Sequence, residues 1–103
     1  MQRRVVITGL GAVTPLGNTV AETWEAVCAG RSGIGPITKF DSRAFATQIA
    51  GEIKHFDPLA FVDKKELRRL DDFIIYALAA AEMAAADAAL VVGDKNAERV
   101  GVY

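Results

Sequence analysis

The sequence is poor in the residues that most often carry chemistry at protein sites. Among its 103 residues are one cysteine and one histidine. A single cysteine cannot form a disulfide within the chain, and one cysteine with one histidine is too small a set for a zinc site. Charge is also balanced, with 12 Lys and Arg against 13 Asp and Glu, and the net charge of −1 argues against general affinity for nucleic acid.

Long apolar runs are missing too. The first four residues, MQRR, carry two positive charges, but the apolar run behind them is short and ends in Gly-Leu-Gly. That pattern does not predict a signal peptide. The longest apolar region, 73–92, contains Glu82 and Asp87 and is mostly alanine, so it is a poor candidate for a membrane span. We therefore expect a soluble, cytoplasmic protein that binds neither membrane nor nucleic acid.

The stretch VVITGLGAVTPLGNT, residues 5–19, looks like the start of a dinucleotide-binding turn. Gly9 and Gly11 fit the G-x-G-x-x-G pattern, but its sixth position is Thr14. The next helix also starts late, because Thr19 and Glu22 have the spacing of a capping box. A nucleotide site needs the helix N-terminus beside the glycine turn. We therefore interpret the segment as a strand followed by a structural glycine loop.

The pattern along the chain predicts the opening of a layered α/β fold. Valine and isoleucine runs indicate strands, and helix signals include Gly30 at a C′ position and Asp63 at an N-cap. The expected elements are a strand at 4–10, a helix at 19–29, a loop at 31–41, a short strand at 48–53, a turn at 55–58, helices at 63–69 and 71–89, and a strand at 99–103.

Two apolar faces are expected to be buried. No charge interrupts residues 73–81, so this half of the long helix should be covered on several sides. An apolar stripe is expected on the first helix, made of Val20, Trp24, Val27 and Cys28. Cys28 is therefore predicted to fill the core rather than to react. His55 has no partner nearby in sequence and is predicted to lie in a surface turn.

The best candidate for a binding site is the segment DKKELRRLD, residues 63–71. We call four of its residues the basic edge: Lys64, Lys65, Arg68 and Arg69. Helical spacing would place them on one side of a slightly acidic protein. They form either a solvated helix face or a docking surface for an acidic partner, since local positive charge steers such encounters.

Taken together, these segments resemble the N-terminal part of a type II beta-ketoacyl-ACP synthase (3-oxoacyl-[acyl-carrier-protein] synthase II). The resemblance covers essentially all 103 residues. It is carried by RRVVITGLGAVTPLGNT, by WxAVxAGRSGI from Trp24, by FDSRAFATQIAGEI from Phe40, by DKKELRRLDDFIIYAL from Asp63, and by the final RVGVY. It implies a thiolase-like fold with αβαβα layers, of which residues 1–103 would be an incomplete first part of the N-terminal half.

The resemblance also implies a function. Enzymes of this family are acyltransferases of fatty-acid biosynthesis that act as homodimers, without an organic cofactor. They condense an acyl-cysteine with malonyl-ACP, and their cysteine and two histidines are expected beyond Tyr103. No catalytic residue is thus expected in this chain, and alone it should be inactive. The basic edge (Lys64, Lys65, Arg68 and Arg69) matches the family's docking site for acidic acyl carrier protein.

Two alternatives stay open at this point. The chain could come from a polyketide ketosynthase or from its cysteine-lacking chain-length partner, since the first segment fits those proteins equally well. It could also be a non-enzymatic module that docks acyl carrier protein through the basic edge. The chain-length preference of an enzyme cannot be predicted, because most of the acyl pocket is built later in the family's sequence.

Overall fold

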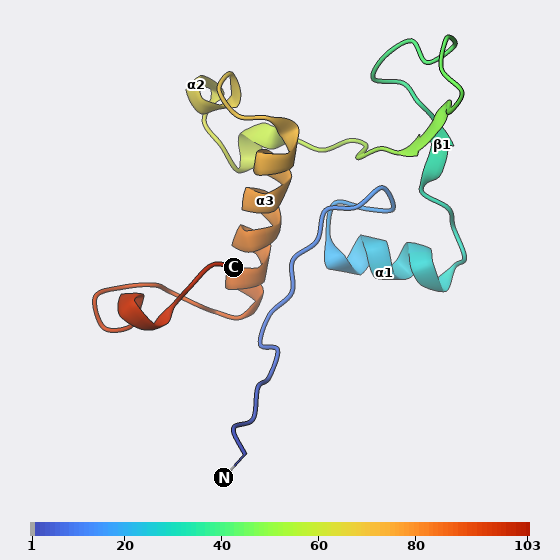
Figure 1. Cartoon of the computed structure of the whole chain (residues 1–103). Helices are drawn as coiled ribbons and strands as arrows, with labels where there is room; N and C mark the ends of the chain where they lie inside the picture. Colours follow the sequence, from blue (N-terminus) through green and yellow to red (C-terminus); the bar gives the residue numbers. More distant parts are fainter. Residues whose placement is uncertain (1) are drawn as a thin grey trace.

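The structure is a computed structural model that describes residues 2–103. Met1, which belongs to the expected 1–103 domain, lies outside the described residues. Figure 1 traces the chain and labels its main elements. In chain order they are α1 (Val20–Cys28), β1 (Ile34–Pro36), β2 (Ile49–Gly51), the 3₁₀ turn η1 (Pro58–Ala60), α2 (Lys64–Leu67), α3 (Asp72–Asp87) and the 3₁₀ turn η2 (Ala97–Arg99).

Helix α1 begins where the capping signal predicts. Thr19 is the N-cap, and its hydroxyl oxygen accepts a hydrogen bond from the backbone N–H of Glu22 at 3.1 Å. The Glu22 carboxylate reaches back and accepts from the N–H of Asn18 at 2.7 Å, one residue earlier than a standard capping box. Gly30 follows the helix with φ 68°, the left-handed conformation that glycine adopts at no steric cost.

A small antiparallel sheet follows α1. Strands β1 and β2 pair Ile34 with Gly51, Gly35 with Ala50, and Pro36 with Ile49. The sequence predicts β2 correctly as a short strand, but the loop expected at 31–41 is wrong in its first part, because β1 lies inside it. Glycine and proline in β1 weaken its strand signal, and its ladder depends on a partner fifteen residues away.

The long helix α3 confirms the prediction at 71–89 to within two residues at each end, with Asp71 at the N-cap. The N-terminal segment runs along it without helical or strand structure (Figure 1). A Cβ atom added at Gly9 would overlap the backbone of Ala84 and Ala88, and one at Gly11 would overlap that of Ala80. The first two glycines of the opening stretch therefore serve the close approach of two backbones.

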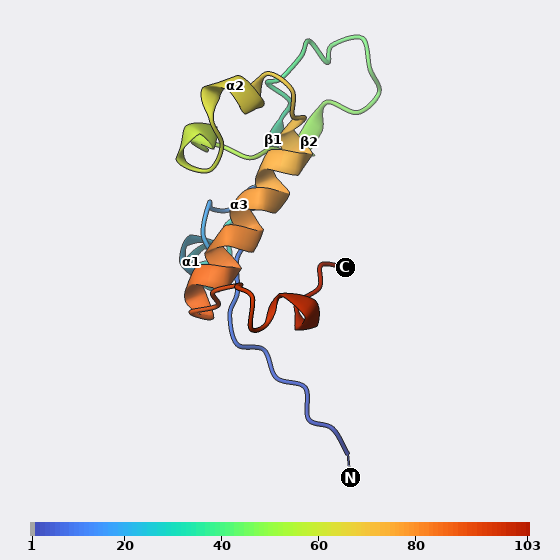
Figure 2. The same cartoon turned by 90° about the vertical axis from the view of Figure 1, so that its left-hand side faces the viewer.

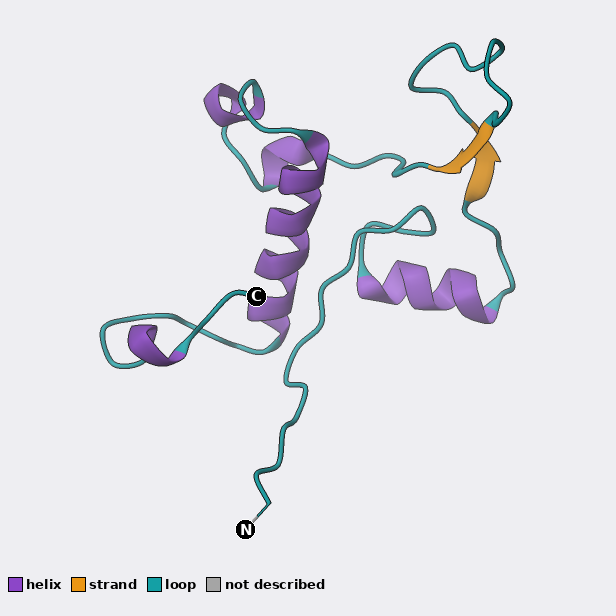
Figure 3. Cartoon of the chain, viewed as in Figure 1, coloured by secondary structure: helices purple, strands orange, loops and turns teal. Residues whose placement is uncertain are grey.

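Both expected terminal strands are absent from the structure. Residues 4–10 and 100–103 have no strand assignment, and η2 occupies the start of the second expected strand. Figure 3 shows β1 and β2 as the strands of the described chain. A strand needs a neighbour to complete its hydrogen bonds, and neither apolar segment finds one within residues 2–103.

The expected burial of two helix faces is also wrong. Trp24 is 67% exposed, Val27 50%, and Cys28 is exposed, so the apolar stripe of α1 faces outward. On α3, Phe73 is 68% exposed, and of the expected buried region Ile75 and Ala79 are buried. These faces lack cover because the molecule is elongated, measuring 55 × 37 × 22 Å along its principal axes.

The elongated shape leaves a very small core. The buried apolar residues are Ala26, Val62, Ile75 and Ala79. Figure 2 shows α2 near one end of α3 and the N-terminus extending away beyond its other end. The helices and the short sheet thus agree with an α/β chain, and they are consistent with part of a layered fold without confirming the layers.

Candidate functional site

Helix α2 carries the basic edge at one end of the molecule. It spans Lys64–Leu67, so the helix expected at 63–69 is shorter than predicted, and Arg68 is its C-cap. The N–H of Arg69 donates to the carbonyl of Glu66 at 2.8 Å, which keeps the chain turning beyond the helix. All four basic side chains, Lys64, Lys65, Arg68 and Arg69, belong to exposed residues. The structure therefore places the predicted site residues together on the surface.

The charges of the basic edge are not neutralised by direct ion pairs. Within residues 2–103 the ion pairs are Arg31–Glu25, Lys39–Asp72 and Arg43–Asp41. None of them includes a residue of the basic edge. Its four cationic groups thus face solvent, where they are available to a partner that carries negative charge.

An aromatic cluster joins the residues around η1 to α3. The rings of Phe56 and Phe61 stack with centroids 5.7 Å apart, and Tyr76 of α3 meets Phe56 edge-on at 5.2 Å. These are favourable geometries for aromatic pairs. Leu67 of α2 and Tyr76 also line one open cavity of about 250 Å³. The cluster thus packs the residues on either side of η1 against α3.

Lys39, which is not part of the basic edge, lies beside this aromatic cluster. The Nζ atom of Lys39 donates to Oδ2 of Asp72 at 3.0 Å and stands 5.9 Å from the centre of the Tyr76 ring. The hydrogen bond that Lys39 donates to Asp72, followed by the electrostatic interaction with Tyr76, raises the pKa of Lys39 above its ordinary value. The ammonium group therefore stays charged at neutral pH and offsets the carboxylate at the start of α3.

The backbone that carries Lys39 is itself held by a carboxylate. Glu52 accepts hydrogen bonds from the hydroxyl of Thr38 at 2.8 Å, from its N–H at 3.0 Å and from the N–H of Lys39 at 3.2 Å. The bonds from the side chain and N–H of Thr38 lower the pKa of Glu52 below its ordinary value. One carboxylate thus organises the turn that leads from β1 into the loop.

Lys39 and Asp72 are the residues near this site that sequence reasoning missed. They are 33 residues apart, and although Asp72 lies within the DKKELRRLDDFIIYAL segment, nothing in the sequence marks the two residues as a pair. Helix spacing reveals partners three or four residues apart, but not a contact between a loop and a distant helix. The F-D motif that begins at Phe40 is the nearest sequence signal.

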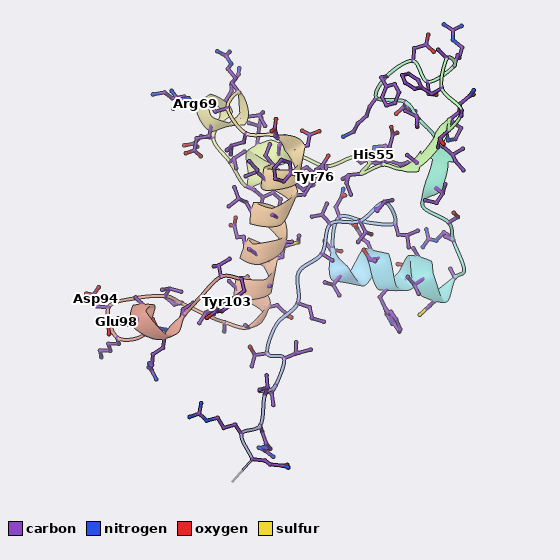
Figure 4. All side chains as sticks on the ribbon, in the orientation of Figure 1. His55, Arg69, Tyr76, Asp94, Glu98 and Tyr103 are labelled. Carbon is purple, nitrogen blue, oxygen red and sulfur yellow. The ribbon has the colours of Figure 1, made fainter. Side chains whose placement is uncertain are left out.

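Neither Cys28 nor His55 belongs to the basic edge, although His55 lines the same open cavity as Leu67 and Asp72. Cys28 is exposed at the last residue of α1, so the prediction that it fills the core is wrong. His55 lies in an exposed bend, as predicted, with φ 55°, which is uncommon for a residue with a side chain. Figure 4 shows His55 on the connection that leads toward α3.

Two further findings concern residues 2–103 as a whole. No group of three or more His, Cys, Asp or Glu side chains in this range is placed to hold a metal ion. Within the same range, no helix is both long and apolar enough to cross a membrane.

Comparison with known proteins identifies the class. The profile described as "Beta-ketoacyl synthase, N-terminal domain" matches residues 2–103. The chain therefore belongs to the beta-ketoacyl synthase family, and the resemblance noted in the sequence is confirmed.

Named relatives narrow the family further. The chain is 50% identical over 101 residues to "3-oxoacyl-[acyl-carrier-protein] synthase 2" of Coxiella burnetii, and 48% identical over 101 residues to the protein of that name from Synechocystis sp.. Each alignment covers 98% of this chain and 24% of the relative. The chain thus spans about a quarter of the length of the curated relatives that it matches.

A solved structure agrees in its backbone. "The ishigamide ketosynthase/chain length factor" superposes with a TM-score of 0.79 at 40% sequence identity, over 88% of this chain and 23% of that one. The elongated arrangement of helices and short strands is therefore similar to one part of a ketosynthase-type structure.

Proposed function

We propose that this chain is the first part of a 3-oxoacyl-ACP synthase of fatty-acid biosynthesis. The observation that carries the proposal is the 46–50% identity to 3-oxoacyl-[acyl-carrier-protein] synthase 2 proteins along nearly the whole chain. The proposed fold of the whole enzyme is thiolase-like, with αβαβα layers, and residues 1–103 form an incomplete part of its N-terminal half. The proposed enzyme is a cytoplasmic homodimer.

The proposed reaction is a decarboxylative Claisen condensation in two stages. First, a cysteine thiolate attacks the thioester of acyl-ACP, and the carrier protein leaves as its free thiol. Malonyl-ACP then loses CO₂, and the electron pair of the broken carbon–carbon bond forms an enolate. The enolate carbon attacks the acyl-cysteine, the cysteine leaves as thiolate, and the product is a 3-oxoacyl-ACP that is two carbons longer.

None of these chemical roles is assigned to residues 1–103. Two histidines that stabilise the enolate oxygen, together with the nucleophilic cysteine, are proposed to lie beyond Tyr103. Cys28 ends helix α1 and His55 occupies an exposed bend, and within residues 2–103 neither side chain makes a hydrogen bond to an acid or base. The chain alone is therefore proposed to be inactive in condensation.

What this chain contributes to the proposed function is docking. The basic edge (Lys64, Lys65, Arg68 and Arg69) is exposed and unpaired within the described range. Acyl carrier protein is acidic, so positive charge at this position attracts it and orients it. Rim charges of this kind act mainly on the association rate and on its dependence on salt.

One experiment tests activity and docking together. The full-length natural protein is supplied with acyl-ACP and malonyl-ACP, and the 3-oxoacyl-ACP product is measured by mass spectrometry. Reversing charge in Lys65→Glu or Arg68→Glu should weaken carrier-protein binding about fivefold, which corresponds to about 1 kcal/mol for each pair. Lys95→Glu, an exposed lysine between α3 and η2, is the control and should leave binding unchanged.

The outcomes separate the two claims. Absence of condensation by the full-length protein contradicts the enzymatic proposal. If the full-length protein condenses its substrates but both charge-reversal variants bind carrier protein normally, the docking proposal is contradicted and the enzymatic proposal is not. Binding without condensation leaves a module that docks acyl carrier protein without acting on it.

A second candidate function is a polyketide ketosynthase or its chain-length partner. The structural similarity to the ishigamide ketosynthase/chain length factor, at 40% identity, favours it. The two candidates differ at the position of the catalytic cysteine, because a chain-length partner lacks that nucleophile. Labelling with a cysteine-directed condensation inhibitor therefore distinguishes a condensing enzyme from a chain-length partner, and product length distinguishes fatty-acid from polyketide synthesis.

A further inference from the structure

Negative charge lies directly beside the basic edge. Asp71 and Asp72 follow Arg69 and Leu70 in the sequence, and both carboxylates belong to exposed residues. Asp72 is three positions after Arg69, a span that reaches at most about 11 Å. Figure 4 shows Arg69 in the turn that follows α2 and Tyr76 near the beginning of α3, on either side of this connection. An acidic partner that lands on the basic edge therefore also approaches carboxylates that repel it.

Lys39 masks one of these carboxylates. Its Nζ atom is 3.0 Å from Oδ2 of Asp72, and the side chain of Lys39 is 50% exposed. An ammonium group has three N–H donors, and Asp72 takes one of them. Because half of the Lys39 side chain is exposed, a carboxylate or phosphate of a partner can reach it.

The position of Lys39 is set by more than its ion pair. Glu52 holds the backbone N–H groups of Thr38 and Lys39 at 3.0 and 3.2 Å. The ring of Tyr76 lies 5.9 Å from Nζ, a distance at which an aromatic face attracts a cation. Glu52 therefore positions the backbone of Lys39, while Asp72 and Tyr76 position its ammonium group at the start of α3.

We propose that Lys39 is a further docking residue for acyl carrier protein and acts by masking Asp72 beside the basic edge. The inference rests on the proposed function, because it needs an acidic partner on that edge. It extends the docking surface from α2 across the first turn of α3 to the loop after β1. It also assigns a function to a contact between segments that are distant in sequence.

A purely structural tie between the loop and α3 is the competing explanation for the Lys39–Asp72 pair. A structural tie predicts lower stability and unchanged affinity when Lys39 is neutralised. Masking predicts lower affinity with nearly unchanged stability, because an exposed pair contributes little to folding. It further predicts that removing the Asp72 charge compensates for the loss of the Lys39 charge.

The test measures the dissociation constant of fluorescently labelled acyl-ACP for the full-length natural protein at low ionic strength. Lys39→Gln should weaken binding about two- to fivefold, the range expected for one exposed charge. Lys39→Arg keeps the charge and should bind as the unmodified protein does. The double variant Lys39→Gln with Asp72→Asn should recover most of the lost affinity.

Arg43→Gln is the matched control, since Arg43 lies in the same loop and pairs locally with Asp41 at 2.6 Å. Arg43→Gln should change the dissociation constant less than Lys39→Gln does.

Thermal unfolding of each variant checks that it is folded. If Lys39→Gln binds like Arg43→Gln while Arg68→Gln binds more weakly, or if the double variant recovers nothing, masking is wrong. If Arg68→Gln also binds normally, docking on the basic edge fails as well.

Discussion

At the scale of single residues, the half-buried Glu52 organises the backbone around it. Its carboxylate accepts bonds from the hydroxyl and N–H of Thr38 and from the N–H of Lys39. Hydrogen bonds to a charged acceptor are stronger than neutral ones, and the charged form of Glu52 is the form they favour. Glu52 thus links the end of β2 to the loop that carries Lys39.

This arrangement predicts a pH dependence. Because the bonds from Thr38 lower the pKa of Glu52 from its ordinary value of 4.5, its contribution to stability is present above that pH and is lost as the pH falls through the lowered pKa. Glu52→Gln should therefore lower the thermal midpoint of the full-length natural protein at pH 6, with a difference that shrinks below about pH 4. Midpoints measured from pH 3 to pH 7 check this expectation.

The control is Glu98→Gln, an exposed glutamate at η2 whose side chain makes no hydrogen bond or ion pair within residues 2–103. Its midpoint should follow that of the unmodified protein at every pH. A Glu52→Gln difference that grows as the pH falls would have the wrong sign and would contradict the assignment.

At the scale of residues, the sequence predicts features whose signal is local. The basic edge could be recognised because its four cations fall within six residues, and the structure places them on the surface. The Lys39–Asp72 pair could not be recognised, because it depends on how a loop folds against α3. Cys28 was assigned to the core from its helical spacing, but spacing does not say whether a partner covers that face.

At the scale of elements, the N-terminal segment packs closely against α3 along a line of small residues, which we call the seam. Gly9 and Gly11 alternate along an extended segment and face Ala80, Ala84 and Ala88, which repeat every four residues along one face of the helix. The N–H of Leu10 donates to the carboxylate of Asp87 at 2.9 Å. Small residues on both sides let the two backbones approach closely.

The seam predicts that Gly11→Ala is destabilising. The added Cβ would overlap the carbonyl oxygen of Ala80, and relief requires the segment to move away from α3. Overpacking of this kind costs about 1–3 kcal/mol. Chemical denaturation of the full-length natural protein should show the loss as a lower midpoint.

Gly35→Ala serves as the matched control. A Cβ at Gly35 meets nothing within 4 Å, so Gly35→Ala should change the free energy of unfolding by no more than about 0.5 kcal/mol. Equal midpoints for Gly11→Ala and Gly35→Ala would mean that the seam tolerates a side chain and that the glycines of the opening stretch have another role.

An element could be predicted from the sequence where it satisfies its backbone hydrogen bonds within itself. The bounds of α1 and α3 follow from the capping residue Thr19, from Gly30 and from helical composition, because a helix satisfies its hydrogen bonds within itself. The strands expected at 4–10 and 99–103 have strong valine and isoleucine patterns, yet they form no ladder among the described residues. Their sequence pattern indicates a buried strand but does not supply the neighbour.

At the scale of the whole molecule, the surface is far larger than a compact chain of this size exposes. The accessible surface is 8799 Å², whereas a compact monomer of 11.0 kDa exposes about 5,600 Å². The radius of gyration is 17.2 Å, compared with about 13 Å for a compact chain of 100 residues. The excess of roughly 3,000 Å² is in the range of obligate interfaces between protein parts.

The exposed apolar residues show where that excess lies. Val5 is 94% exposed, Ile7 81%, and Val102 98%, in the two segments expected to be strands. Trp24 and Phe73 add exposed apolar surface on α1 and α3. These features are consistent with a chain that covers about a quarter of its relatives' length, since further polypeptide in those relatives can cover equivalent faces.

The whole-molecule prediction concerns residues 1–103 produced alone. With four apolar side chains buried, hydrophobic burial is too small to offset the conformational entropy lost when about a hundred residues become ordered. We therefore expect strong binding of the dye ANS, a broad thermal transition and no condensation of acyl-ACP with malonyl-ACP. The full-length natural protein should bind little ANS and unfold cooperatively. A sharp transition with little dye binding by residues 1–103 would instead identify a self-sufficient domain, and the exposed valines would then need a partner other than the same polypeptide.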